Sequence, residues 1–422
     1  MTARPRSALI AMVVAAALGG AAATLPAHSA DSSFANLARG KRMVDAGDCV
    51  ACHTADGGKP FAGGRPIETP FGVIYSPNIT PDRDTGIGAW SDEDFYRAMH
   101  EGIAADGSRL YPAFPYPYFT KMTRDDVTAV RAYLAAVPAV RSERPRNALT
   151  WPLNNRVFMR GWNMMFFKAG TFQPQPDKSA EWNRGAYLVQ GPGHCGACHT
   201  PKTVLGSDKT SQVLRGGLVQ NWFAPKIANT KGDGLGDWSV DDVVEYLKTG
   251  RNKHSGAAGL MAEVVRHSTS KLPDEDLHAI ATYLKDVDGG PEPDGGKPDA
   301  AVANAGARVF KDSCSGCHNA DGKGVPGMLP PLARNANVQQ RDPTTVLRVI
   351  LEGARTEPTD KRPTPFAMPA YGWKLTDAQI AAVASYVRTS WGNKGGAVDT
   401  ATVESLRKSL KKDLHGNPTG GS

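Results

Sequence analysis

Three stretches of the chain carry apolar residues at helical spacing, and each opens with residues typical of a helix N-terminus. They start at Thr123, Pro273 and Thr376, and each has acidic or amide side chains in its first turn. A tyrosine then holds the same place in every stretch, at Tyr133, Tyr283 and Tyr386. This recurrence predicts a mainly α fold built from three repeats of one small helical unit.

A glycine lies in a shorter helical pattern upstream of each of these closing helices. The three are Gly40, Gly185 and Gly306. Because glycine has no Cβ atom, we expect the aromatic residue of the closing helix to pack close to its backbone. Repeats one and two also share a segment, at 86–94 and 234–242, in which Ser91 and Ser239 are predicted N-caps.

The N-terminus differs from the rest of the chain. Arg4 and Arg6 precede an uncharged run from Ala8 to Pro26 that ends among small residues. This layout predicts a signal peptide over 1–30, and the alternative is an uncleaved membrane anchor. No other apolar run reaches about 18 residues, so we expect the mature chain not to span a membrane.

The composition of the 422 residues is that of a globular protein, with 41% hydrophobic and 22% charged residues. Removing Arg4 and Arg6 lowers the formal net charge from +7 to +5. A mildly basic protein can dock on acidic partners or lipid headgroups, but no nucleic-acid motif accompanies the charge. We therefore expect no nucleic-acid partner.

Six cysteines in an exported chain would ordinarily suggest disulfides, but their spacing predicts different chemistry. They form three C-x-x-C pairs, each followed directly by histidine: Cys49, Cys52 and His53; Cys195, Cys198 and His199; Cys314, Cys317 and His318. C-x-x-C-H is the attachment site for c-type haem. Two thiols on one turn can add to the two vinyl groups of the porphyrin, and the adjacent histidine can ligate the iron.

The alternatives for each pair are a redox C-x-x-C or half of a zinc site. Three complete motifs with no cysteine left over predict three covalent haems c. Trp90 and Trp238, which stand at matching places in repeats one and two, are then interpreted as packing residues beside haem in preference to electron relays.

The repeats and the segments between them predict the domain organisation. In order these are the signal peptide 1–30, domain one 31–140, an apolar linker 141–180, domain two 181–288, a Gly/Pro linker 289–300, domain three 301–392 and a basic tail 393–422. Each domain is predicted to be a class I cytochrome c unit. We expect the apolar linker to wrap domains one and two together, and a docking surface for a partner subunit is the alternative.

Electron-transfer haem commonly takes a methionine as its second axial ligand. In domain three Met368 is the candidate, and its rival Met328 lies in a proline-rich segment closer to the histidine. In domain two Met261 is the only methionine between the motif and the closing helix. Domain one aligns Phe114 or Pro115 with Met368, which leaves Met122 as the candidate ligand. The alternative for Met122 is a packing residue just before the helix cap.

The chain resembles the trihaem cytochrome c subunits of periplasmic, membrane-associated dehydrogenases, such as quinoprotein alcohol dehydrogenase and gluconate or fructose dehydrogenase. The likeness rests on the three C-x-x-C-H motifs and on LYPAFPY at 110–116, TWPLNNR at 150–156 and GLMAEVV at 259–265. The chain departs from the family at Phe114, where several members have methionine.

The resemblance implies an electron-transfer subunit, without catalytic activity of its own, on the periplasmic face of the cytoplasmic membrane. It would pass electrons from a dehydrogenase subunit, with or without a small third subunit, to ubiquinone or another respiratory acceptor. The partner's substrate would be an alcohol, aldehyde, sugar or heterocycle. The alternatives are a peroxidase-like haem enzyme with an open first haem and a free-standing multihaem carrier.

Membrane contact would be peripheral. The tail places Val403, Leu406, Leu410 and Leu414 along one face of a helix with basic residues around it. Such a helix can lie on anionic lipid, and an exposed helix or a disordered tail are the alternatives.

Overall fold

The computed structural model describes residues 33–414, besides Met1. The predicted signal peptide therefore lies outside the described residues, except for Met1. None of the helices in the described part of the chain combines the length and the apolar character that crossing a membrane requires.

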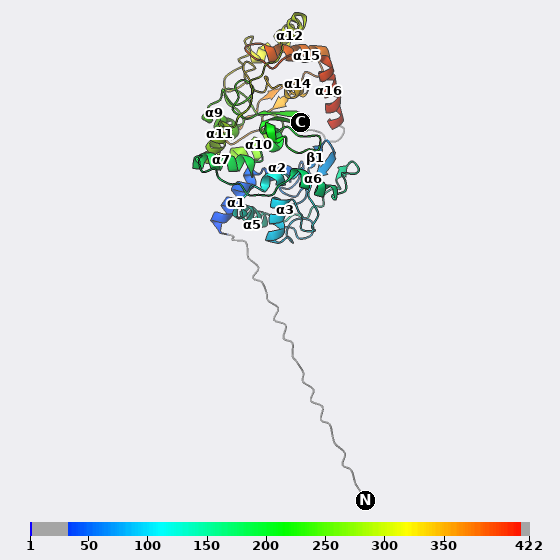
Figure 1. The fold of residues 1–422 in the computed structure, drawn as a ribbon. Coiled ribbons are helices and arrows are strands. Elements are labelled where there is room, and N and C mark those ends of the chain that lie inside the picture. The colour runs from blue at the N-terminus through cyan, green and yellow to red at the C-terminus, as the bar shows by residue number, and fades with distance from the viewer. Residues whose placement is uncertain (2–32, 415–422) are drawn as a thin grey trace.

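Three pairs of packed helices form the frame of the molecule. The pairs are α1 (Phe34–Ala46) with α5 (Arg124–Ala136), α7 (Ala180–Gln190) with α11 (Asp274–Leu284), and α12 (Ala300–Ser313) with α15 (Asp377–Thr389). Figure 1 shows the pairs stacked in chain order, with the first at one end of the molecule and the third at the other. The mainly α fold predicted from the periodicity is confirmed.

The close contact expected within each pair is present. A Cβ atom built on Gly40 would lie 2.0 Å from the carbonyl oxygen of Ala129, and one on Gly185 would lie 1.9 Å from that of Ala279. Gly306 meets its partner helix in the same way. Any larger residue would force the two helices of a pair apart, which explains why glycine recurs here.

The helix starts follow the predicted chemistry. Ser91, Ser239 and Thr376 each form a reciprocal capping box with the residue three positions later. Their helices are α3 (Asp92–Glu101), α9 (Val240–Thr249) and α15. The hydroxyl of Thr123 caps α5, whereas Pro273 starts α11 without a side-chain cap.

Short helices and hairpins complete the frame. The remaining helices are α2 (Cys49–Cys52), α4 (Tyr116–Phe119), α6 (Phe158–Phe166), α8 (Gly196–His199), α10 (Leu260–His267), α13 (Ser315–His318), α14 (Thr344–Glu352) and α16 (Thr400–Leu414). Two 3-10 turns lie at Thr210–Gln212 and Thr269–Lys271. The strands are β1 (Pro66–Thr69), β2 (Gly72–Tyr75), β3 (Ala148–Leu149), β4 (Arg215–Val219), β5 (Trp222–Lys226), β6 (Ala354–Arg355) and β7 (Ala367–Met368). All pairings among them are antiparallel: β1–β2–β3, β4–β5 and β6–β7.

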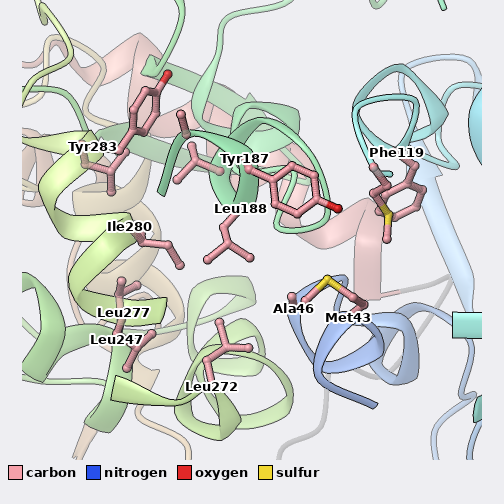
Figure 2. Close-up of a cluster of buried hydrophobic side chains, with 14 of the residues drawn as sticks. Met43, Ala46, Phe119, Tyr187, Leu188, Leu247, Leu272, Leu277, Ile280 and Tyr283 are labelled. Carbon is pink, nitrogen blue, oxygen red and sulfur yellow. The ribbon is translucent and has the colours of Figure 1, made fainter. Parts of the chain in front are cut away.

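The first two helix pairs share one hydrophobic core. Met43 and Ala46 of α1 lie beside Tyr187 and Leu188 of α7, and Leu277 of α11 belongs to the same cluster (Figure 2). The third pair has separate clusters of its own. Polar contacts join it to the second, since Thr345 exchanges two hydrogen bonds with the backbone of Phe223.

The apolar linker packs on the first unit and reaches into the second. Its helix α6 buries Met159 and Trp162 against Tyr116, and the indole of Trp162 donates a hydrogen bond to the carbonyl of Leu205 at 2.9 Å. The linker also reaches the start of α5, where the amide of Phe172 donates to the carbonyl of Lys121 at 3.0 Å.

The tail helix was predicted to lie on lipid, with an exposed helix or a disordered tail as alternatives, and the structure differs from all three. Val403 and Leu410 of α16 are 0% and 4% exposed, and they pack with Leu347 and Leu351 of α14 and with α15. Arg407 adds an ion pair to Asp377 at 2.7 Å. The apolar face of α16 therefore belongs to the core of the third unit, and neither a disordered tail nor a lipid-facing helix describes residues 400–411. The side chain of Leu414 lies outside the described set.

Candidate haem-attachment sites

Each C-x-x-C-H motif forms a single turn of helix just after the first helix of its pair. The turns are α2, α8 and α13; α2 and α13 start within three residues of the ends of α1 and α12, and α8 starts six residues after the end of α7. One turn places both thiols and the imidazole together, as attachment to a porphyrin requires. All six cysteines are free, so both thiols of every turn are available for thioether links.

Two of the three imidazoles are held by prolyl carbonyls. The Nδ1 atom of His53 donates to the carbonyl of Pro77 at 2.8 Å, and that of His199 donates to Pro225 at 2.6 Å. Pro77 lies just beyond the β1–β2 hairpin and Pro225 lies in β5, so each hairpin positions the acceptor. Because a carbonyl can only accept, Nδ1 carries the proton, and the lone pair of the neutral ring is on Nε2, where it can ligate a metal.

The third imidazole is less constrained. Pro330 lies near His318 and its carbonyl favours the charged ring, but burial has the larger effect and lowers the pKa of His318. Its Nδ1 atom is buried and has no hydrogen-bond partner in the described part of the chain. The third turn therefore has the same two thiols and imidazole as the other two, but within the described residues no hydrogen bond orients the ring of His318.

Burial sets the protonation of all three sites. It lowers the pKa of His53 and His199 as well as that of His318, so the rings are neutral at neutral pH, as an iron ligand must be. Burial also raises the pKa of Cys195 to about 12 and that of Cys314 to about 11. These thiols are far from the low-pKa thiolates of redox C-x-x-C motifs, which argues against that alternative.

The zinc alternative is also disfavoured. Among residues 33–414, no group of three or more His, Cys, Asp or Glu side chains is arranged to hold a metal ion. The donor set of two thiols and one oriented imidazole on a single turn fits covalent haem c. When bound, haem supplies reversible one-electron chemistry at its iron.

Each C-x-x-C-H turn follows the first helix of a packed helix pair. This arrangement defines the chain as a c-type cytochrome. The family model for cytochrome c matches residues 37–138 and 303–391. The chain is 42% identical to the cytochrome c subunit of a quinone alcohol dehydrogenase from Gluconacetobacter polyoxogenes, over 93% of this chain and 88% of that protein. It is 40% identical to the gluconate 2-dehydrogenase cytochrome c subunit of Pantoea cypripedii, over 89% of this chain and 90% of that protein.

A further relative is larger than this chain. One of the nicotinate dehydrogenase subunits of Pseudomonas putida is 45% identical over 84% of this chain, but the match spans only 30% of that protein. The chain belongs to the family of cytochrome c subunits of dehydrogenase complexes, and its function is electron transfer with covalent haem c.

The candidate methionine ligands differ in how far they are exposed to solvent. Met261 on α10 and Met368 in β7 are both half-buried. The rival Met328 is 57% exposed. Met122 is only 1% exposed, in the core cluster that also contains Met43 and Phe119.

Aromatic residues surround Phe114, at the position where the resemblance predicts methionine. Phe114 is half-buried and packs on Phe119 with ring centroids 5.3 Å apart, and Phe119 in turn lies 5.5 Å from the ring of His194. Trp238 of the second unit is buried and stacks on His254 at 5.1 Å. This contact supports the interpretation of Trp238 as a packing residue.

An ion pair joins the first two attachment sites, and no pattern in the sequence indicates it. Arg65 donates to the carbonyl of Ala51, inside the first motif, at 2.8 Å. It also pairs with Glu263 at 2.7 Å, and Glu263 lies on α10, two residues after Met261. Cys198 is close enough to contribute to the raised pKa of Cys52. The two turns therefore lie side by side, although the paired residues are 198 positions apart in the chain.

Proposed function

We propose that this chain holds three covalent haems c and carries electrons from a dehydrogenase catalytic subunit to ubiquinone or another respiratory acceptor. Cys49 with Cys52, Cys195 with Cys198, and Cys314 with Cys317 would form the thioether links. His53, His199 and His318 would be the proximal ligands, and Met261 and Met368 the distal ligands of the second and third sites. The domain boundaries predicted from the sequence accompany this proposal.

The observation that carries the proposal is the repetition of one attachment turn on three equivalent helix pairs. Each turn presents two thiols and a neutral imidazole, and the first two turns adjoin across Arg65 and Glu263. The chain's own residues thus keep two candidate one-electron sites close together, with Cys49 and Cys195 packed against one shared core. Proximity of this kind is what electron transfer between sites requires.

The partner and location rest on the relatives. Their names identify cytochrome c subunits of a quinone alcohol dehydrogenase and of gluconate 2-dehydrogenase, and a subunit of nicotinate dehydrogenase. An alcohol, aldehyde, sugar or heterocycle is therefore the proposed class of donor for the partner subunit. A small third subunit can complete the complex. The proposed location is the periplasmic face of the cytoplasmic membrane, with peripheral contact only.

Haem stoichiometry tests the proposal. The chain is produced in a host that attaches c-type haem, and the haem content per chain is measured by the pyridine haemochrome spectrum and by intact mass. We expect three haems, and we expect each of the double variants Cys49→Ala with Cys52→Ala and Cys195→Ala with Cys198→Ala to lose one. A wild-type chain with two haems would refute the count.

A second experiment tests the partner. Affinity capture of the haem-loaded chain from its own cells should bring down a dehydrogenase catalytic subunit, and the partner's substrate should then reduce the cytochrome. A chain that is recovered alone and is reduced only by small soluble proteins would favour the free-standing carrier.

One observation favours the peroxidase-like alternative at the first site alone. Phe114 cannot ligate iron, and it stands where the resemblance predicts methionine. In this alternative Met122, which is 1% exposed in the core, is a packing residue and His53 has no distal partner. A first site of this kind would be high-spin in the ferric state and would react with hydrogen peroxide. Three low-spin sites in the electron paramagnetic resonance spectrum would exclude this function.

A further inference from the structure

The segment between the first and second helix pairs carries an exposed apolar surface. Its members are Trp151, Val157, Phe158, Met164, Met165 and Phe166, and we call them the 151–166 apolar surface. Trp151 and Met164 are 84% and 85% exposed. Single exposed apolar residues are ordinary, but a cluster this dense in one short segment indicates a contact with something outside the chain.

The orientation of this surface is fixed by the other face of α6. Met159 and Trp162 are buried on that face, and Asn163 accepts a hydrogen bond from the hydroxyl of Tyr116 at 2.5 Å. The helix cannot turn its exposed residues inward without breaking these contacts. Figure 1 shows α6 at the edge of the molecule, near β1.

A basic pocket adjoins the apolar surface. It has a volume of about 370 Å³ and is lined by Arg144, Arg146 and Arg156, together with Tyr111 and uncharged residues of the same segment. Arg156 directly precedes Val157, so the pocket and the apolar surface are continuous along the chain. The pocket is of a size that binds small ligands.

The positive charge of the pocket is opposed by one nearby carboxylate. Hydrogen bonds from Ser108 lower the pKa of Asp106, and the charge of Arg156 lowers it further. Within residues 33–414, no carboxylate forms an ion pair with any of the three arginines that line it. Arg156 donates to the hydroxyl of Ser108 at 3.0 Å and to the carbonyl of Arg109 at 3.2 Å, which positions it without cancelling its charge. Burial lowers the pKa of Arg144, and the charge of Arg156 lowers it further. Like charges held together in this way favour binding of an anion.

We propose that Arg144, Arg146 and Arg156 bind the phosphate of an anionic phospholipid headgroup while the 151–166 apolar surface enters the membrane interface. This inference deepens the proposed function, because it assigns the peripheral membrane contact to a particular surface. The tail helix cannot serve this role with the apolar face of residues 400–411, which is buried against α14 and α15.

The charges favour a lipid surface over a protein partner. Residues 141–168 contain six basic residues and one acidic residue. Arg141 is paired with Asp84, which leaves five basic side chains in the segment to face the solvent or a ligand. A protein interface usually has a polar rim of both signs, whereas an anionic membrane presents only negative headgroups. Tryptophan and phenylalanine side chains beside arginines also occur in interfacial membrane-binding helices.

Vesicle binding tests the proposal with the haem-loaded full chain. Sedimentation is measured with vesicles of phosphatidylglycerol and phosphatidylcholine, and with phosphatidylcholine alone. We expect binding only to the former, weakened roughly 30-fold by Arg144→Gln with Arg146→Gln and about five-fold by Arg146→Gln alone. Arg146→Gln is informative by itself, because it removes no hydrogen bond found within residues 33–414. Met164→Ser with Met165→Ser should weaken binding at least about ten-fold.

Matched variants elsewhere control for charge and hydrophobicity. Arg42→Gln with Arg308→Gln removes two exposed charges from other helices, and Met328→Ser removes an exposed methionine; both should bind vesicles as the wild type does. Arginine variants that bind like the wild type would overturn the proposal. The proposal would also be overturned if the chain bound soluble glycerol phosphate through these arginines but did not bind vesicles.

The protein-partner alternative has its own outcome. If the arginine variants lose the dehydrogenase subunit while their vesicle binding is unchanged, the surface docks a protein and the lipid proposal fails. Failure here is distinguishable from failure of the proposed function, because haem content and reduction by the partner's substrate are measured separately and do not depend on vesicles.

Discussion

Replacing Gly185 with alanine tests the contact on which each helix pair is built. The added Cβ would lie 1.9 Å from the carbonyl oxygen of Ala279 and 2.9 Å from the Cβ of Tyr283. Ordinary contact needs about 3.4 Å or more, so α7 and α11 must separate. Overpacking of this kind lowers the free energy of unfolding by about 1–3 kcal/mol. The higher helix propensity of alanine offsets about 0.5–1 kcal/mol of that loss. We expect a net loss of about 1–2 kcal/mol, confined at first to the second unit.

Hydrogen exchange followed by mass spectrometry suits this prediction, because it reports on α7 and α11 separately from the other helices. The expected change is exchange that is roughly 5- to 30-fold faster in peptides from these two helices. Gly161→Ala is the matched control, since among the described residues nothing lies within 4 Å of a Cβ built there. That variant should slow exchange in α6 slightly. Protection in Gly185→Ala equal to that of the wild type would refute the packing argument.

Three further predictions concern the sites, the pH dependence and the tail. Met261→Ala should abolish the absorption band of a methionine-ligated ferric haem at the second site, whereas Met122→Leu should leave the spectrum unchanged; loss of a band in the latter would restore Met122 as a ligand. Burial raises the pKa of Asp242, but hydrogen bonds from its helix cap and from neighbouring basic side chains outweigh burial and lower it to about 2. Its contribution to stability is therefore complete above about pH 4 and is lost as the pH falls through 2; Asp242→Asn should remove this part of the acid dependence of the denaturant midpoint, and an unchanged dependence would contradict the assignment. Leu410→Ala should destabilise the third unit by about 2–4 kcal/mol, as measured by hydrogen exchange in α14 and α15, while the exposed Lys411→Ala should not; equal protection in both would mean that α16 is not part of the core.

The sequence by itself determined the features that depend on neighbours along the chain. The spacing of two thiols and a histidine is settled within one turn of helix, so the three motifs could be found without coordinates. The caps at Ser91 and Ser239 bond to an amide three residues away, and they were predictable for the same reason. The repeats also predicted one long-range contact. Because a glycine and a tyrosine recur together in each repeat, as at Gly185 and Tyr283, the two residues were expected to lie where the two helices of a pair pack together.

Only the tertiary structure decided what each apolar segment packs against. Periodicity gives a helix an apolar face but not its partner. An anionic lipid surface was therefore the contact predicted for the apolar face of the tail, and only the structure placed Val403 and Leu410 of α16 against α14 and α15. Met122 likewise has the residue type of a ligand, and its enclosure in the core depends on helices from two units. The bridge from Arg65 to Glu263 joins charges 198 positions apart. Such contacts follow from how the three units stack, and that stacking is set by side-chain packing that no local pattern records.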